Sequence, residues 1–241
     1  NYFKIGRLNI DQLKIIHEYN IDCIIFCAGK NTYDINNSID CYVKDNLLSI
    51  TNLFPTLKQI SPKKFIFISS CSVYGDNPTN EDSYIKPISI NGIINNLSEK
   101  IIFEFCKVNN IPASILRIFN VYGGKDNFSV LNHLIEAKRN NKTFTLINDG
   151  TSIRDFIHVE DVGMVINKLL NYETLPKILN IGTGQGTQIS ELVNTFIQIN
   201  GKVKINKIKN DNEVKISISN GLKLKRFVKV NFKHILTNIP K

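Results

Sequence analysis

The 241-residue sequence contains no tryptophan, only one methionine (Met164), and no apolar run approaching the roughly 18 residues that a membrane-spanning helix needs. We therefore expect no membrane partner. The chain begins at Asn1 and its one methionine is internal, so we expect residues to be missing before it. Apolar residues make up 42% of the chain, which is ample for a core and too high for a disordered protein.

Cysteine is scarce and irregularly spaced. The five cysteines are an odd number, and their spacing fits no disulfide framework. Cys23 and Cys27 would point to one face of a strand, but two ligands without a second pair make a poor zinc site. We therefore expect no metal site, and interpret the cysteines as buried, reduced thiols of a cytoplasmic protein.

The formal net charge is +9, but the basic residues are diffuse. One mild concentration lies in the tail and is interleaved with valine and isoleucine (Lys202, Lys204, Lys207, Lys209, Lys223, Lys225, Arg226 and Lys229). A nucleic-acid-binding protein usually clusters its basic residues, so we expect no nucleic acid, and a basic nucleic-acid module is the remote alternative. The charge balance also suits an anionic small molecule such as a nucleotide diphosphate.

Short β-rich runs alternate with helical patterns along the chain. The expected strands are 21–29, 63–70, 113–123, 144–147 and 177–182. The expected helices are 10–19, 40–60 with an interruption near Pro55, 92–109, 127–141, 159–172 entered through Asp155 to Asp161, and 189–199. Continuous apolar strands separated by helices predict a doubly wound α/β domain with a parallel sheet.

In such a sheet, ligands bind beyond the carboxyl ends of the strands. Three strands end in small, hydroxyl or amide residues, namely Ala28-Gly29, Ser69-Ser70 and Phe119-Asn120. Each pair taken alone could be an ordinary entry to a loop. Together they favour the floor of a ligand site.

Four segments then carry a resemblance to a known family. They are Ser69-Ser70-Cys71-Ser72-Val73-Tyr74-Gly75, Arg117-Ile118-Phe119-Asn120-Val121-Tyr122-Gly123, the block 149–162 (DGTSIRDFIHVEDV) and Asn180-Ile181-Gly182-Thr183-Gly184. In this order they resemble the signatures of the extended short-chain dehydrogenases, the NAD-dependent nucleotide-sugar epimerases and dehydratases. The resemblance runs from about Gly6 to Leu192 and implies NAD or NADP as cofactor and a nucleotide-diphosphate sugar as substrate.

The resemblance also implies a domain plan. Residues 1–123 would form a partial Rossmann domain that lacks its first βαβ unit, and 124–241 a small substrate lobe, with 156–182 returning to the Rossmann sheet. The family's glycine-rich pyrophosphate turn is absent from this chain, so we expect weak cofactor affinity of residues 1–241 alone. The run from Gly182 to Gly186 imitates such a turn only superficially. The family's adenine-contacting acid is here Arg7.

The second departure from the family concerns its Tyr-x-x-x-Lys pair. Pro87, Ser89, Gly92 and Glu99 align without a gap, which puts Asn91 at the tyrosine position and Asn95 at the lysine position. The tyrosine acts as a base near neutral pH only because the lysine and the oxidised nicotinamide lower its pKa. An asparagine can neither act as that base nor supply that charge. The alternative is that the two asparagines are ordinary surface residues.

The resemblance assigns the other site residues by position. Cofactor contacts would come from Leu8, Ala28, Gly29, Asn46, Ser69 and Phe119. Ser70 stands at the catalytic serine or threonine position and would also contact substrate, while Asn120 and Arg154 would hold the nucleotide diphosphate. The alternative for Arg154 is a surface salt bridge to Asp155 or Asp161. His158 is interpreted as a packing or hydrogen-bonding residue.

Two functions remain open at this point. The first is an epimerase/dehydratase-like protein whose catalysis is impaired. The second is a pseudoenzyme that binds nucleotide sugar or acts as the partner of an active relative. The family resemblance further implies a homodimer, or a dimer with a related subunit, formed through the helices at about 40–60 and 92–109.

Overall fold

The computed structural model describes residues 20–30, 39–76 and 79–240. Its centre is a parallel sheet in the order β1-β2-β3-β7. These strands are β1 (Cys23–Phe26), β2 (Lys64–Ser70), β3 (Ala113–Ile118) and β7 (Ile178–Ile181). The sheet confirms the predicted parallel α/β fold, and its continuous apolar strands are explained by helices on both faces.

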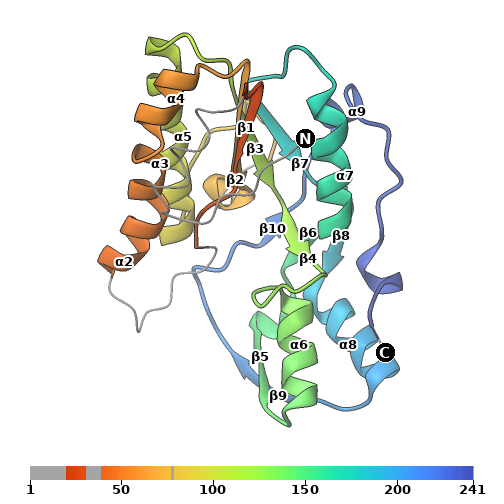
Figure 1. The fold of residues 1–241 in the computed structure, drawn as a ribbon. Coiled ribbons are helices and arrows are strands. Elements are labelled where there is room, and N and C mark those ends of the chain that lie inside the picture. The colour runs from red at the N-terminus through yellow and green to blue at the C-terminus, as the bar shows by residue number, and fades with distance from the viewer. Residues whose placement is uncertain (1–19, 31–38, 77–78, 241) are drawn as a thin grey trace.

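Helices cover both faces of this sheet, with α4 (Phe54–Ile60) and α5 (Ile90–Val108) on one side and α7 (Val159–Leu170) on the other (Figure 1). Alternate side chains of β2 pack on the two faces. On one face, Phe65 and Phe67 of β2 pack with the cluster that contains α4 and α5. On the other face, Ile66 packs with the cluster that contains α7. The predicted 10–19 helix lies outside the described residues.

The predicted interruption of the 40–60 helix is confirmed. The segment consists of α2 (Ile39–Val43), a π-helical turn (Lys44–Leu48), α3 (Ser49–Thr51) and then α4. Pro55 lies in the first turn of α4, where its missing N–H would have no intrahelical partner in any case.

Two sequence expectations were wrong. The run 113–123 is not one strand, because β3 ends at Ile118 and β4 (Asn120–Tyr122) belongs to a second sheet. Asp155 does not lie at a helix entry but inside β6 (Ile153–His158). The second sheet has the order β10-β6-β4, with β8 (Gly186–Gln188) pairing antiparallel to β6 and β10 (Ile216–Ser217) at its edge.

A lower lobe has its own core (Figure 1). It contains α6 (Val130–Arg139), β5 (Thr143–Ile147), α8 (Ile189–Asn200) and β9 (Lys204–Ile208). β9 pairs in parallel with β5 and was missed in the sequence, because all five of its residues are exposed and give no alternating pattern. The division into 1–123 and 124–241 stays a prediction; β7 lies in the central sheet and β6 in the second.

Short elements complete the described chain. They are α9 (Leu222–Lys225) and the 3-10 turns Cys71–Tyr74, Asn148–Gly150 and Ile235–Thr237. Within the described ranges, no helix is long and apolar enough to cross a membrane, and no group of histidine, cysteine or acidic side chains is arranged to hold a metal. The five cysteines are free, but Cys27 and Cys41 are exposed, so the expectation of buried thiols was wrong for these two.

Candidate functional site

The three predicted strand ends lie at one edge of the central sheet. Ser70 at the end of β2 is in register with Ile118 at the end of β3, and Ile118 is in register with Ile181 of β7. β1 pairs with β2 on the other side. The parallel register therefore gathers Ala28-Gly29, Ser69-Ser70 and Phe119-Asn120 at the edge where α/β sheets bind ligands.

Asn46 joins the end of β1 to the helix that follows. Its Oδ1 accepts a hydrogen bond from the backbone N of Lys30 at 2.9 Å, and its Nδ2 donates to the Tyr42 carbonyl at 2.8 Å. A Cβ on Gly29 would lie 2.7 Å from Asn46 Oδ1, so the small residue permits this close approach. Gly29 and Asn46 are thus brought together, while Leu8 lies outside the described residues.

The start of α5 is held tightly against the loop after β2. Ser89 caps the helix by accepting a hydrogen bond from the backbone N of Gly92 at 3.1 Å. A Cβ on Gly92 would lie 2.4 Å from the carbonyl oxygen of Ser72 and 2.9 Å from Pro87 Cβ. This approach of helix to loop brings Asn91 next to Ser72.

Gly92→Ala is therefore expected to destabilise the fold, although alanine favours helices. Overpacking against a backbone carbonyl costs about 1–3 kcal/mol. The matched control is Gly163→Ala in α7, where a Cβ would meet nothing within 4 Å and should stabilise the helix by up to about 1 kcal/mol. Urea unfolding measures both free energies; equal values for the two variants would contradict the tight packing.

Asn91 and Asn95 form a joined amide cluster. Asn91 Oδ1 accepts hydrogen bonds from the Tyr42 hydroxyl at 2.7 Å and from Asn95 Nδ2 at 3.0 Å. Asn91 Nδ2 lies 3.4 Å from Ser72 Oγ. The two asparagines are part-buried and face one another, so they are not ordinary surface residues.

Tyr42 brings a phenol to this cluster but no base. Burial raises the pKa of Tyr42 to about 12, which keeps its hydroxyl protonated at neutral pH. The hydroxyl donates a hydrogen bond to Asn91 Oδ1. In this structure the Tyr42 phenol is thus a hydrogen-bond donor to Asn91.

A buried ion pair between Arg117 and Glu99 is hydrogen-bonded to Ser69 at the end of β2. Arg117 donates to Glu99 through Nε at 3.1 Å to Oε1 and through Nη2 at 2.7 Å to Oε2. Ser69 Oγ donates to Glu99 Oε1 at 2.5 Å. Burial works to lower the pKa of Arg117, but the hydrogen bonds and charge of Glu99 outweigh it and the pKa is raised.

The network continues to β7 of the central sheet. Arg117 Nη1 donates to the Tyr74 hydroxyl at 2.9 Å, and that hydroxyl donates to Asn180 Oδ1 at 2.8 Å. The backbone N of Asn180 in turn donates to Glu81 Oε1 at 2.9 Å. Arg117, Tyr74 and Asn180 stand in the segments that carry the family resemblance, but we assigned them no role from the sequence. A lone arginine inside the apolar strand 113–118 was a usable signal.

The three predicted contact residues at the strand ends differ in solvent exposure; they are Ser69, Phe119 and Ser70. Ser69 is 4% exposed and Phe119 is 1% exposed, so both lie in the interior. Phe119 packs in a cluster with Val73 and Tyr74. Ser70 is half-buried, and its Oγ accepts a hydrogen bond from the backbone N of Ser72 at 3.2 Å.

The glycine-rich run after β7 wraps around an internal carboxylate. Asp155 is fully buried; its Oδ1 accepts a hydrogen bond from the Thr183 N and its Oδ2 one from the Gly184 N, both at 2.9 Å. Burial is the largest influence on Asp155 and raises its pKa. The backbone amides that could cradle a phosphate are thus committed to Asp155, which supports the low weight given to this turn as a dinucleotide site.

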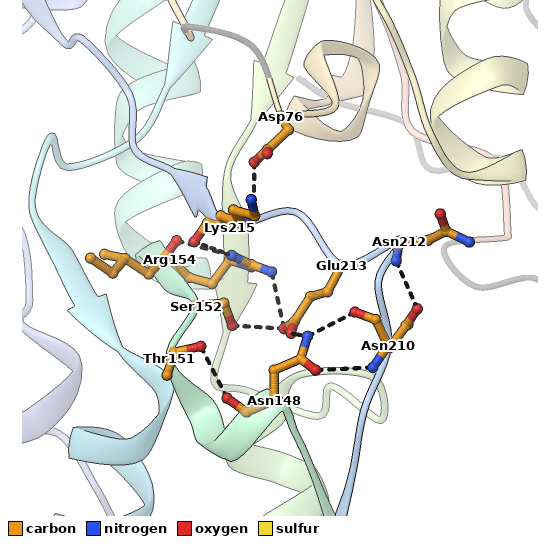
Figure 2. A network of polar contacts seen from close by, with 10 residues as sticks. Asp76, Asn148, Thr151, Ser152, Arg154, Asn210, Asn212, Glu213 and Lys215 are labelled. Carbon is orange, nitrogen blue, oxygen red and sulfur yellow. Dashed lines mark hydrogen bonds and ion pairs between the residues drawn. The ribbon is translucent and has the colours of Figure 1, made fainter.

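Asn120 and Arg154 lie in neighbouring strands of the second sheet. Asn120 Nδ2 donates to the Asp155 carbonyl at 2.9 Å, and Asn120 pairs with Phe156 across β4 and β6. Neither Asp155 nor Asp161 pairs with Arg154, so the alternative of a surface salt bridge to one of these two acids was wrong. Its ionic partner is Glu213, 3.4 Å away (Figure 2).

His158 caps a helix. Its Nδ1 accepts a hydrogen bond from the backbone N of Glu160 at 3.3 Å, and its ring packs edge-on against Tyr122. A Cβ on Gly123 would lie 2.4 Å from His158 Nε2. This placement accords with the packing and hydrogen-bonding role predicted for His158.

The model of the NAD dependent epimerase/dehydratase family matches residues 4–182. This chain belongs to that family. The match covers most of the chain, includes every described strand end discussed above, and confirms the resemblance seen in the sequence.

Two relatives show the extent of the likeness. A protein from Methanocaldococcus jannaschii is 31% identical over 184 residues, covering 72% of this chain and 59% of that protein. UDP-glucuronate 4-epimerase of Thermodesulfobacterium geofontis is 27% identical over 214 residues, covering 83% of this chain and 64% of that protein. This chain thus spans less than two thirds of either relative.

Solved structures show the same fold. A mutant of UDP-glucuronic acid 4-epimerase from Bacillus cereus, in complex with UDP-4-deoxy-4-fluoro-glucuronic acid and NAD, superposes with a TM-score of 0.86 at 26% identity. The match covers 99% of this chain and 78% of that one. UDP-glucose 4-epimerase of Thermus thermophilus, in complex with NAD, has a TM-score of 0.79 at 21% identity and covers 93% of this chain and 77% of that one.

Proposed function

We propose that this protein binds a nucleotide-diphosphate sugar and is impaired in the epimerase or dehydratase chemistry of its family. The observation that carries the proposal is the amide cluster of Asn91 and Asn95, which stands where the family places a tyrosine and a lysine. Neither amide titrates near neutral pH, and the nearby Tyr42 hydroxyl stays protonated. No group in the cluster can therefore take a proton from a sugar hydroxyl.

NAD or NADP is the cofactor that the site would hold. The close approach of Gly29 to Asn46 and the position of Ser70 at the strand ends fit a nicotinamide nucleotide, while the amide of Asn95 supplies no charge beside it. The bound cofactor supplies a hydride acceptor. The residues of this chain would orient the ligand, and the Ser70 hydroxyl would contact the substrate. Asn91 and Asn95 would transfer no proton.

The nucleotide diphosphate would lie between Asn120 and Arg154. The B. cereus relative binds UDP sugars and NAD, which supports a uridine nucleotide as the first probe. The guanidinium of Arg154 suits a phosphate, because its planar donors match two oxygens at once.

We expect Arg154→Met to weaken UDP binding by about tenfold or more, the usual worth of a charge-assisted hydrogen bond to a phosphate. Calorimetry with UDP and the full-length protein measures the dissociation constant. The control is Arg139→Met in α6, an arginine that is 71% exposed and pairs with Glu136 at the same 3.4 Å. UDP affinity unaltered by Arg154→Met, or no heat from wild type with any UDP or GDP sugar, would overturn the binding proposal.

The second candidate function is a pseudoenzyme that acts as a subunit. Three apolar side chains on one helix favour it, since Ile93, Leu97 and Val108 of α5 are 51%, 41% and 76% exposed. An exposed helical row of this kind suits a homodimer or a dimer with a related subunit. Light scattering of the purified protein tests it, and a monomer at all concentrations would argue against self-association.

A further inference from the structure

We propose that Glu213 is an internal counter-ion of Arg154, which occupies the guanidinium and competes with the nucleotide diphosphate for it. The proposal rests on the proposed function, since it concerns the same arginine. It adds that a phosphate group reaches this guanidinium only by displacing a carboxylate of the protein itself. The segment from Asn210 to Lys215 would then act as a strap across the anion site.

The carboxylate is held on both oxygens (Figure 2). Oε1 accepts a hydrogen bond from the Ser152 hydroxyl at 2.7 Å and lies 3.4 Å from Arg154 Nη2. Oε2 accepts one from Asn148 Nδ2 at 2.9 Å. Two neutral donors thus hold the Glu213 carboxylate beside Arg154. The position of the carboxylate therefore does not depend on the 3.4 Å ion pair alone.

The strap is also fastened by its backbone at two places. Asn210 and Asn148 form a reciprocal pair, in which the Asn210 N donates to Asn148 Oδ1 at 2.9 Å and Asn148 Nδ2 donates to the Asn210 carbonyl at 2.7 Å. Beyond Glu213, the Lys215 N donates to Asp76 Oδ1 at 2.7 Å. Both of these anchors are side chains of other elements, but the Ile153 N of β6 also donates to the Lys215 carbonyl at 2.8 Å. Only the part of the strap before Lys215 can therefore move away without breaking a backbone bond to the sheet.

Both terminal nitrogens of the Arg154 guanidinium already donate hydrogen bonds within the protein. Nη1 donates to the carbonyls of Ile153 and Lys215 at 3.0 and 3.4 Å, and Nη2 faces Glu213. The side chains of Arg154 and Glu213 are only 15% and 16% exposed, so water screens the pair weakly. A bound phosphate would meet both an engaged cation and a nearby negative charge.

The closing experiment compares Glu213→Gln with wild type in the full-length protein. Glutamine keeps the size of the side chain and one of its two hydrogen-bond acceptors, but removes the charge. The control is Glu136→Gln, which neutralises the carboxylate paired with Arg139 at the same 3.4 Å on an exposed helix. UDP affinity is measured by calorimetry, and the rate of Arg154 modification by phenylglyoxal is followed by mass spectrometry without any nucleotide.

We expect Glu213→Gln to bind UDP about tenfold more tightly and to expose Arg154 to faster modification, with Glu136→Gln like wild type. Equal or weaker UDP binding by Glu213→Gln would overturn the proposal, and weaker binding would make Glu213 a direct ligand of the nucleotide. If no variant binds UDP, the proposed function fails. In that case the rate of Arg154 modification alone tests whether Glu213 shields Arg154. An unchanged rate in Glu213→Gln would refute the shielding.

Discussion

Asn91→Tyr combined with Asn95→Lys is expected to raise turnover of a UDP sugar with NAD by about 10²–10⁴-fold, the usual worth of a general base. The two positions face each other on one side of α5, where Asn95 Nδ2 already contacts Asn91 Oδ1 at 3.0 Å. The introduced lysine would place an ammonium beside the introduced phenol and lower its pKa. The full-length protein with NAD is the form to assay.

The matched control is Asn91→Phe with Asn95→Lys, which restores the ring and the ammonium without the hydroxyl. It should turn over no faster than wild type. Tyr42→Phe provides a second control, because it removes the phenol that donates to Asn91 at 2.7 Å and should not lower residual turnover. An equal gain in the phenylalanine variant would show that size, not proton transfer, limits the site.

Glu99→Gln is expected to cost about 3–5 kcal/mol of unfolding free energy, because it leaves the charge of Arg117 buried and unpaired. The Arg117 and Glu99 side chains are 3% and 4% exposed, so solvent has little access to replace the lost partner. At about 2–4 °C per kcal/mol for a domain of this size, the melting temperature should fall by about 10 °C. Thermal unfolding followed by circular dichroism measures the shift.

Glu104→Gln is the matched control on the same helix. Glu104 is 74% exposed and its nitrogen partner on Lys107 is 3.9 Å away, so its loss should cost less than about 0.5 kcal/mol. Glu99→Leu with Arg117→Met should be more stable than either single variant, because both charges are then removed together. A melting temperature for Glu99→Gln within a degree of that for Glu104→Gln would contradict the buried pair.

The sequence was a good guide to the central sheet for a physical reason. Its strands are buried on both faces, so β2 and β3 appear as continuous apolar runs that no helix pattern imitates. The break at Phe119 could not be seen, because the apolar run continues while the chain changes sheets. β9 gave no signal at all, since the pairing with β5 is made by backbone groups of exposed residues.

The site was predictable where it depends on strand ends and not where it depends on contacts distant in sequence. Ser70 and Gly29 follow from the rule for parallel sheets, and the asparagine pair from a gapless motif. Glu213 lies 59 residues from Arg154, and its segment carries no motif that would pair the two. The alternative for Arg154 accordingly named only acids close by in sequence, Asp155 and Asp161, whose carboxylates have other partners.

The most direct test of impaired catalysis is a single-turnover assay of the wild-type, full-length protein with NAD and a UDP sugar, recorded as NADH absorbance. We predict hydride transfer at least about 10²-fold slower than in the double variant that combines Asn91→Tyr with Asn95→Lys. Hydride transfer by wild type as fast as by that double variant would contradict the claim that Asn91 and Asn95 disable the site.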